Sequence, residues 1–582
     1  MRIPLVVLGC VLVMDSSAVA EPLRSPLRFM DQQPVPYARV VERDTSAVAA
    51  LAGLSENEET LVREFPRADG GASDVKVRRV SILAPGTKVS LGGPDGVRLI
   101  DPPAVTLLSG SLVDDPDTRV FLSLSAFGTN GFIIGSEGTE VISGGPTATG
   151  AITVYRIDGL PEGIIRWGEH LCGTDALHGI TPRGHRVKSG EDGGWGSRGI
   201  PCRRADLAIE TDWELTRDTF AGNPNASAAY VMTLMAAISE IYTRDINTRL
   251  RVNFLRVWEA DTDPYSTSGT LNRLFEFQDW WNANMTGTPR NAAHILSGVR
   301  GEYGGVAYLP GLCQNEYDYG LSTYLNGSFP YPLLNNVHQN WDLVVTAHEL
   351  GHNFGAPHTH NVTPPIDGCG LGDCSQAASG TIMSYCHTCG GGLSNINLTL
   401  HPRLISENIL PYLSGEAPCD TLWSGADFTS GPVDSSGTLC DRGSLTFTAT
   451  AEGSYTIEWF SLDSQNVATL VVDGINGDGS SYAGSGTNTL VVHNPQSTTP
   501  TRFRAEIVAG CGRTTSRVAT ITYLHQADFN GDGFVDGFDY DDYVTCFEGF
   551  VCPPGKTADF NGDGFADGFD YDDFVTAFEA EC

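Results

Sequence analysis

The sequence predicts a multidomain protein with an α/β domain at its centre. The chain has 582 residues, enough for several domains. An apolar helical pattern near the middle ends in three closely spaced histidines, at 341–358. Segments 527–548 and 558–579 agree at 19 of 22 positions, so a duplicated small module lies near the C-terminus. Between these two features, short alternating strands predict a β-sandwich.

These features divide the chain into five predicted parts. They are a signal peptide (1–20), a β-rich segment (21–200), the α/β domain (201–420), the β-sandwich (421–524) and a small α module with two calcium loops (525–582). The α/β domain is predicted from alternating helix-like and strand-like stretches, as at 226–243 and 250–258.

The first 20 residues have the composition of a secretory signal peptide. Arg2 gives a charged start, residues 3–14 form an apolar run, and the small residues 18–20 match an A-x-A cleavage site. An alternative is a lipoprotein anchor at Cys10, although the apolar run before that cysteine is very short. We therefore expect a secreted, extracellular or cell-surface-associated protein.

Composition excludes some classes of partner. The net charge is −34, from 36 basic and 70 acidic residues, whereas nucleic-acid binding requires a basic face. No run of eighteen or more apolar residues predicts a membrane span. Fourteen cysteines in a chain with a signal peptide predict disulfides. Without Cys10 thirteen remain, so at least one thiol is free, bonded to another chain or used for another purpose.

The segment 21–200 is predicted to be rich in β-structure. Runs such as 119–125 and 131–135 place apolar, β-favouring residues between glycine-rich turns. The stretch 184–199 is rich in glycine and charge, with basic residues in and beside it at Arg183, Arg186, Lys188 and Arg198. Proteolytic cleavage concentrates in exposed segments of this kind. An ordinary interdomain linker is the alternative, and both interpretations can hold at once.

The α/β domain carries a histidine motif that predicts a catalytic zinc site. On a helix, His348 and His352 lie four residues apart on one face, so both imidazoles can bind one metal. Gly355 allows a sharp turn with positive φ, after which His358 returns as a third ligand. Three protein ligands leave the fourth position of a tetrahedral zinc to water. Glu349 is predicted to be the catalytic base that activates this zinc-bound water.

Three further segments resemble the metzincins, and two of them resemble the adamalysin (reprolysin) branch in particular. Residues 381–385 resemble the Met-turn, which places a methionine, here Met383, beneath the three histidines. Residues 304–313 resemble the rim strand that holds extended substrate, together with its cysteine, and residues 205–212 resemble the opening strand. Adamalysins carry Asp directly after the third histidine, where this chain has Thr359.

The resemblance implies an activity. The chain is similar to secreted zinc endopeptidases, which are made as zymogens and hydrolyse peptide bonds of extracellular proteins, with residues 21–200 as the propeptide. One catalytic Zn²⁺ and a protein or peptide substrate are implied, and Tyr385 is either part of the substrate-side wall or a packed aromatic. Two alternatives remain: a cell-surface adhesion or scaffold protein acting through its C-terminal modules, and a metzincin that cleaves cell-wall peptides.

The cysteines carry further predictions. Similarity to adamalysins pairs Cys313 with Cys419. Residues 170–175 are similar to the cysteine-switch motif of metzincin propeptides, so Cys172 is expected to occupy the fourth zinc position and hold the precursor latent. A disulfide from Cys172 to Cys202 is the alternative, and Cys582 has no assigned partner. Four cysteines bracket the Met-turn and are expected to form disulfides of open pairing, with a second zinc site as the alternative: Cys369, Cys374, Cys386 and Cys389.

Residues 421–524 change character to short alternating strands, as at 444–450 and 455–460. Cys440, Trp459 and Cys511 follow one another in an order that resembles bacterial immunoglobulin-like sandwiches. The resemblance implies that Cys440 and Cys511 are disulfide cysteines and that the module serves spacing or adhesion.

Each copy of the C-terminal repeat contains a calcium-loop pattern. Oxygen ligands recur at loop positions 1, 3, 5, 7, 9 and 12, with a glycine at position 6 for the sharp turn. The predicted ligands of the first loop are Asp528, Asn530, Asp532, Phe534 (through its carbonyl), Asp536 and Asp539. Those of the second are Asp559, Asn561, Asp563, Phe565 (again its carbonyl), Asp567 and Asp570. The duplication and the Asp at position 12 resemble dockerins, which implies two Ca²⁺ and a cohesin-like or cell-surface docking partner.

Overall fold

The computed structural model describes most of the chain. The described residues are 22–168, 170–177, 202–334, 338–339, 341–419, 421–438, 444–453, 455–496, 499–509 and 511–579. The predicted signal peptide, the basic stretch 184–199, Cys440 and Cys582 lie outside them. Within the described part of the chain, no helix is both long and apolar enough to cross a membrane.

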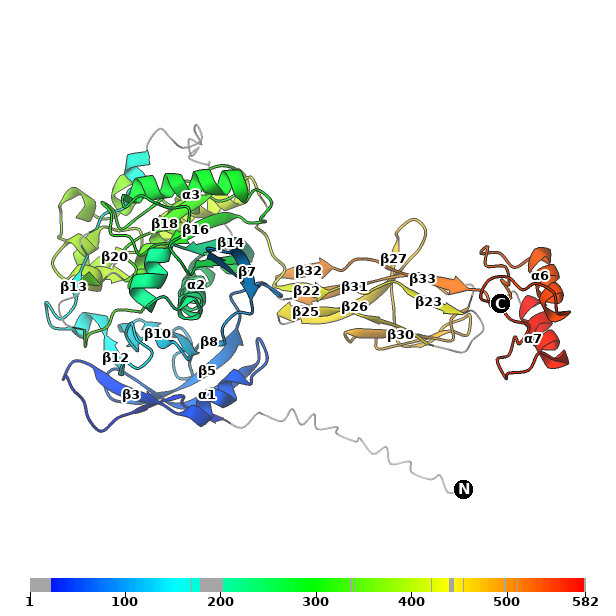
Figure 1. Ribbon diagram of the computed structural model, residues 1–582. Helices are drawn as coiled ribbons and strands as arrows, with labels where there is room; N and C mark the ends of the chain where they lie inside the picture. The colour runs from blue at the N-terminus through cyan, green and yellow to red at the C-terminus, as the bar shows by residue number, and fades with distance from the viewer. Residues whose placement is uncertain are drawn as a thin grey trace, which may run out of the picture. The chain divides into compact units, whose positions relative to one another are not determined.

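The described residues fall into two compact units. Those within 1–196 and 205–420 form one unit, and those within 197–204 and 421–582 form the other. The β-rich N-terminal segment and the α/β domain, drawn in blue to yellow-green in Figure 1, therefore share a unit.

A ten-stranded sheet dominates the N-terminal segment. Its spatial order is β1 (Leu23–Arg24), β4 (Glu59–Pro66), β5 (Ala72–Val80), β8 (Val105–Leu112), β9 (Arg119–Ser125), β10 (Gly128–Gly135), β11 (Gly138–Ser143), β12 (Ile152–Arg156), β3 (Arg39–Arg43) and β2 (Leu27–Phe29). Successive strand residues point to opposite faces. Phe121 accordingly joins the core of the α/β domain, whereas Leu122 packs in a second core with Leu51 of α1 (Thr45–Ala52).

The α/β domain is built on a seven-stranded sheet. Its order is β17 (Gly305–Ala307), β18 (Tyr319–Ser322), β16 (Ala292–Leu296), β14 (Arg203–Thr211), β15 (Thr248–Trp258), β6 (Val89–Gly93) and β7 (Gly96–Ile100). Three longer helices accompany it: α2 (Pro224–Ile246), α3 (Thr270–Asn284) and α4 (Asp342–Asn353). The predicted helix at 226–243 lies within α2 and the predicted strand at 250–258 within β15, so both are confirmed.

The hairpin β6–β7 belongs to the N-terminal segment yet extends the sheet of the α/β domain. Residues 89–92 pair in parallel with residues 255–258. Gly92 lies so close to the indole of Trp258 that a side chain at position 92 would collide with it. This pairing was not predictable from the sequence, because strands far apart in the chain share no local pattern that identifies them as partners.

The second unit contains the predicted β-sandwich region. One sheet has the order β23 (Ser435–Thr438), β33 (Ala519–Leu524), β31 (Arg502–Ala509), β26 (Tyr455–Leu462) and β27 (Ala468–Leu470), with β32 (Gly512–Thr515) also on β31. Another has β24 (Ser444–Thr448), β30 (Thr489–His493), β29 (Ser481–Ala483) and β28 (Gly474–Ile475), and β22 (Ala426–Ser430) pairs with β25 (Thr450–Gly453). Trp459, Phe447 and Phe503 are fully buried in their shared core.

Cys511 is a disulfide cysteine, as expected, and its partner lies outside residues 421–524. Its sulfur is bonded to Cys202, so it is not available to a partner within residues 421–524 such as Cys440. The sequence did not indicate this partner for Cys202, because the two cysteines are 309 residues apart. Cys202 belongs to the second unit.

The C-terminal repeats each form a loop followed by a helix, α6 (Gly537–Phe547) and α7 (Gly568–Glu579). Tyr543 and Phe574 stack between the helices with ring centroids 3.9 Å apart. A disulfide joins Cys546 to Cys552. The core of this small module is thus a few aromatic rings, which is little apolar surface for independent stability.

Candidate active site

The histidine motif lies on α4, and the start of that helix is held firmly. Asp342, the first residue of the helix, accepts hydrogen bonds from the Tyr230 hydroxyl at 2.8 Å and from the backbone N–H groups of Asn326 and Gly327 at 3.0 and 2.9 Å. Burial raises the pKa of this carboxyl to about 7. Every residue of α4 except Val345 is buried, so the helix is positioned by packing along its whole length.

The three histidines converge as the sequence predicts. The Nε2 atom of His352 lies 3.2 Å from Nε2 of His348 and 3.1 Å from Nε2 of His358. The turn that returns His358 passes through Gly355, whose φ of +91° confirms the expected left-handed conformation. Nitrogen ligands about 2.0–2.1 Å from a tetrahedral zinc lie about 3.3 Å from one another, so this spacing fits a zinc ion.

Hydrogen bonds orient two of these imidazoles. Nδ1 of His348 lies 2.7 Å from the Ile382 carbonyl oxygen, and Nδ1 of His352 lies 2.7 Å from the Ala356 carbonyl oxygen. Nδ1 therefore carries the proton, and the Nε2 lone pair faces the centre of the cluster. Burial also lowers the pKa of both histidines, which keeps them neutral as metal ligands must be.

Met383 lies beneath the helix, in the place expected of a Met-turn. It is fully buried, and a side chain added at Gly351 would come within 2.5 Å of its sulfur. The backbone N–H of Thr359 donates to the Met383 carbonyl at 3.1 Å. Thr359, at the position where adamalysins carry Asp, is fully buried and packs against the Met-turn. This chain therefore has no carboxylate at that position beside the histidine cluster.

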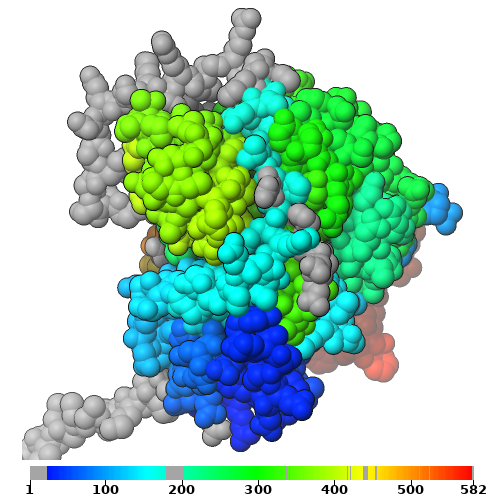
Figure 2. Space-filling view, turned by 90° about the vertical axis from the view of Figure 1, so that its left-hand side faces the viewer, coloured from blue at the N-terminus to red at the C-terminus, as the bar shows by residue number. Residues whose placement is uncertain are grey.

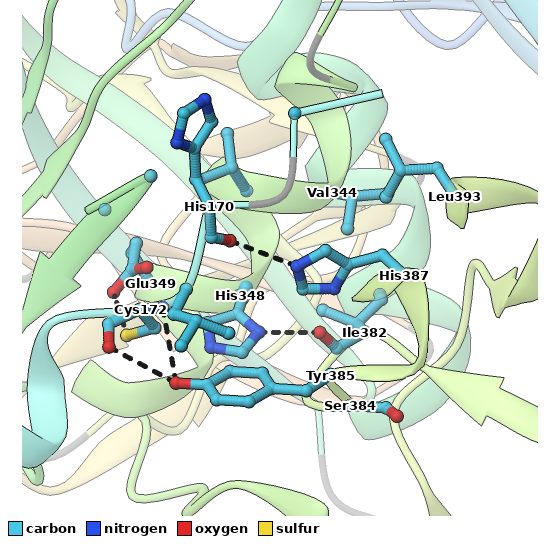
Figure 3. Close-up of a pocket in the computed structure, with 15 residues that line it drawn as sticks. His170, Cys172, Val344, His348, Glu349, Ile382, Ser384, Tyr385, His387 and Leu393 are labelled. Carbon is cyan, nitrogen blue, oxygen red and sulfur yellow. Dashed lines mark hydrogen bonds between the residues drawn. The ribbon is translucent and has the colours of Figure 1, made fainter. Parts of the chain in front are cut away.

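Glu349 lies between the histidines and the rim strand β17. Its side chain is 1% exposed, and burial raises its pKa well above the usual value for a glutamate. Figure 3 shows its carboxylate turned toward the thiol of Cys172, which lies 3.3 Å from Oε2. A carboxylate beside a metal ligand set and not among the ligands can accept a proton from an attacking water.

Cys172 is brought into the histidine cluster from the N-terminal segment. Its sulfur lies 3.4 Å from Nε2 of His352, and its ligand atom groups with those of His348, His352 and His358 within 4.8 Å. Burial raises the pKa of the thiol. Among the described cysteines it is the one without a disulfide. The alternative bond from Cys172 to Cys202 is wrong, because Cys202 is bonded to Cys511.

The residues around Cys172 run along the site as an extended strap, which we define as residues 166–168 and 170–177. The strap follows the rim strand β17: Gly304 N–H donates to the Leu171 carbonyl at 2.9 Å, and Gly173 N–H donates to the Gly305 carbonyl at 2.8 Å. Cys172 and Gly305 form a parallel bridge. In Figure 2 this cyan part of the chain lies between the green and the yellow-green parts of the same unit.

Side chains on both sides of the cleft hold the strap. The Tyr385 hydroxyl accepts from Cys172 N–H and donates to the Cys172 carbonyl, each at 3.2 Å. On the rim side, the Thr174 hydroxyl donates to the Ala307 carbonyl at 2.9 Å. His170 stacks on Tyr324 with ring centroids 3.6 Å apart, and its carbonyl accepts from His387 Nε2 at 3.0 Å. Figure 3 shows the contacts of Tyr385 and His387.

These holding residues were not identified from the sequence, apart from the suggestion that Tyr385 lies on a wall. Asp175, the acidic residue of the cysteine-switch-like segment, lies 3.3 Å from Nδ1 of His358 through its carboxylate. It also accepts from the side chain of Asn361 at 3.0 Å. The resemblance of residues 170–175 to the cysteine-switch motif indicated that Cys172 and Asp175 lie in the site. The roles of Thr174 and His170 depend on contacts across the cleft, which the motif does not reveal.

The remaining cysteines of the domain are paired. Cys313 is bonded to Cys419. The four cysteines around the Met-turn form the pairs Cys369–Cys386 and Cys374–Cys389. The alternative of a second zinc site at these four cysteines is therefore wrong.

The two predicted calcium loops have the same internal geometry. Asp528 Oδ2 accepts from Gly533 N–H at 2.9 Å, and Asp559 Oδ2 accepts from Gly564 N–H at 2.8 Å. Asp539 is buried and accepts from two backbone N–H groups of its own loop. In the described residues, no three carboxylates of a loop bring their oxygens as close together as the histidine nitrogens of the candidate zinc site. The loop oxygens instead accept hydrogen bonds from backbone N–H groups.

Comparisons with known proteins agree with this geometry. The model of the family described as metallo-peptidase family M12 matches residues 202–398. The zinc metalloproteinase-disintegrin-like brevilysin H2a of Gloydius brevicauda is 27% identical over 154 residues, which cover 25% of this chain and 32% of that protein. Disintegrin and metalloproteinase domain-containing protein 1a of Mus musculus is 30% identical over 174 residues, covering 27% of this chain and 20% of that protein.

A solved structure, metalloproteinase-II from Bacteroides fragilis, is 11% identical with a TM-score of 0.29, covering 54% of this chain and 85% of that one. A likeness at that level carries no argument. The chain spans about a third or less of the length of these two curated relatives. Residues 202–398 match a metallopeptidase domain of family M12, in line with the zinc metalloproteinases among the relatives.

Proposed function

We propose that the protein is a secreted zinc-dependent endopeptidase that is made as a latent precursor and hydrolyses peptide bonds of extracellular proteins. One observation carries the proposal: three buried imidazole nitrogens converge at zinc-ligand spacing, and the Cys172 sulfur lies 3.4 Å from His352 Nε2 and 3.3 Å from the carboxylate of Glu349. The disulfides that join cysteines of the described residues support an oxidising, extracellular compartment.

Zinc held by His348, His352 and His358 would polarise the scissile carbonyl and lower the pKa of the attacking water. Glu349 accepts the proton of that water at its carboxylate and transfers it to the leaving amine. The buried setting suits this task, because a raised pKa makes the carboxylate a better proton acceptor. The carbonyls of Ile382 and Ala356 hold two of the histidines in the required orientation.

The rim strand β17 would bind the substrate backbone once the strap is removed. It pairs with β18 on one side, and its other edge bonds to the strap through Gly304 N–H and the Gly305 carbonyl. The same groups are available to an extended peptide that adds as a strand.

We assign latency to Cys172, whose sulfur lies beside the histidine cluster where a fourth ligand would bind. The test is Cys172→Ser in the unprocessed protein, which should hydrolyse peptide without cleavage near residues 183–198. If a folded Cys172→Ser precursor has as little peptidase activity as the wild-type precursor, latency comes from steric blocking by residues 22–177 and not from the thiol.

The activity itself is tested by incubating the processed protein with casein, with and without a zinc chelator. Cleavage that the chelator abolishes and zinc restores is expected. Cleavage that persists in the chelator would refute the zinc mechanism. Absence of cleavage in zinc-replete processed protein would favour the alternative of an adhesion or scaffold protein acting through residues 421–582.

For the C-terminal part we propose two Ca²⁺ ions, one in each loop, an immunoglobulin-like module at 421–524, and docking to a cohesin-like or cell-surface partner. The supporting observations are the repeated loop geometry, with an αL glycine at Gly533 and Gly564 (φ +94° and +95°), and the exposed faces of both loops. Aligned oxygen donors at this spacing suit a hard cation such as Ca²⁺.

A further inference from the structure

Gly305 lies on the rim strand β17, directly against the side chain of the proposed base. A Cβ atom at position 305 would lie 2.5 Å from Oε1, 2.6 Å from Cγ and 2.7 Å from Cδ of Glu349. All three distances are shorter than the closest approach that Cβ atoms make in proteins. All three atoms belong to the side chain of Glu349. Its carboxylate therefore occupies the space that a side chain at position 305 would need.

We infer that Gly305 is a positioning residue for catalysis: its lack of a side chain allows the carboxylate of Glu349 to lie under the rim strand at the distance the reaction needs. The inference rests on the proposed zinc-peptidase function, in which Glu349 is the base. Glycine is not required here by the backbone, because φ of Gly305 is outside the left-handed region. The requirement is for space alone.

The surrounding structure leaves only the carboxylate free to move. β17 is fixed by its pairing with β18, where Gly305 faces Ser322. α4 is fixed on its other side, because Gly351 already packs closely on the Met383 sulfur. A methyl group at 305 would therefore displace the end of a flexible side chain and leave the backbone in place. The fold would persist while the base is moved from its working position.

Gly304, the preceding residue, offers a matched comparison. A Cβ at 304 has His170 of the strap as its three nearest neighbours, the closest at 3.0 Å. Its φ is also outside the left-handed region. The same Gly→Ala change at 304 therefore adds one methyl group immediately before β17 without touching Glu349. Its nearest neighbours all belong to His170, which leaves with the strap.

The experiment compares the processed wild-type protein with Gly305→Ala and Gly304→Ala, using a fluorogenic peptide and measuring bound zinc by elemental analysis. For Gly305→Ala we expect full zinc occupancy, KM within about threefold of wild type and kcat lower by about 10²-fold, since a misplacement of about 1 Å costs that much. Gly304 belongs to the proposed substrate-binding edge, so Gly304→Ala is compared in kcat and not in KM. Its loss of kcat should be at least about tenfold smaller than that of Gly305→Ala.

A double-mutant cycle separates displacement of the base from other effects. Glu349→Asp shortens the base by one methylene, which makes room for the added methyl group. In the Glu349→Asp background, Gly305→Ala should therefore change kcat by less than about threefold, because the two substitutions act through the same contact. The cycle also covers a folding failure: if Gly305→Ala alone does not fold, the double variant should fold.

Three outcomes would overturn the inference. The first is a kcat of Gly305→Ala within a factor of about two of wild type. The second is an equal loss of kcat on Gly305→Ala substitution in the wild-type and the Glu349→Asp backgrounds. The third is that neither Gly305→Ala nor the double variant folds. A processed wild-type protein without zinc-dependent peptidase activity would instead refute the proposed function, because that result does not involve position 305.

Discussion

In the proposed latent precursor, activity depends on how firmly the strap is held, and Tyr385→Phe tests this directly. The substitution removes one oxygen atom and both hydrogen bonds between Tyr385 and the backbone of Cys172, each 3.2 Å long. Each such bond contributes about 0.5–1.5 kcal/mol, so the closed state should lose about 1–3 kcal/mol. The open fraction of the precursor should then rise by about 5–150-fold.

The assay is hydrolysis of a fluorogenic peptide by the uncleaved precursor, expressed as a fraction of the activity of the same variant after processing. This ratio removes any effect of Tyr385 on the substrate itself. Thr174→Val is the matched variant, because it removes two hydrogen bonds to Ala307 on the other side of Cys172 and lies in the strap that processing displaces. The view that these contacts hold the strap closed would be refuted if the precursors of both Tyr385→Phe and Thr174→Val showed no more relative activity than the wild-type precursor.

Two further predictions concern the metals. Glu349→Ala should keep its zinc and its fold but lose proteolysis by about 10²–10⁴-fold or more, because only proton transfer is removed; near wild-type turnover by the zinc-replete variant would contradict the mechanism. Residues 525–582 should be disordered in a calcium chelator and ordered in millimolar calcium, because the loop carboxylates repel one another and the aromatic core is small; an amide NMR spectrum that calcium leaves unchanged would show otherwise.

The local features of the site were predictable from the sequence. His348 and His352 share a face because helix geometry places residues four apart on one side, and the structure brings their Nε2 atoms to 3.2 Å. Gly355 takes up positive φ as its position in the motif requires. The strand at 119–125 follows the period of two, so that Phe121 and Leu122 enter different cores. Each of these depends on spacing within one element.

The pairing of Cys313 with Cys419 was predictable only through resemblance to adamalysins. Cys511 was expected to be a disulfide cysteine, but its partner was not predicted. A disulfide depends on the distance between two Cα atoms, and the sequence order of cysteines does not reveal that distance. Cys202 and Cys511 are 309 residues apart in the chain, with Cα atoms 5.9 Å apart in the structure.

The sequence by itself determined the chemistry of the site: three imidazoles, one carboxylate and a thiol motif, because these follow from residue types at short spacings within each motif. The tertiary structure alone decided which groups meet. It places Cys172 against His352, Glu349 beneath Gly305, and the hairpin β6–β7 on the edge of β15. These are contacts between segments far apart in the chain, and their partners are selected by the packing of the whole unit rather than by any local periodicity.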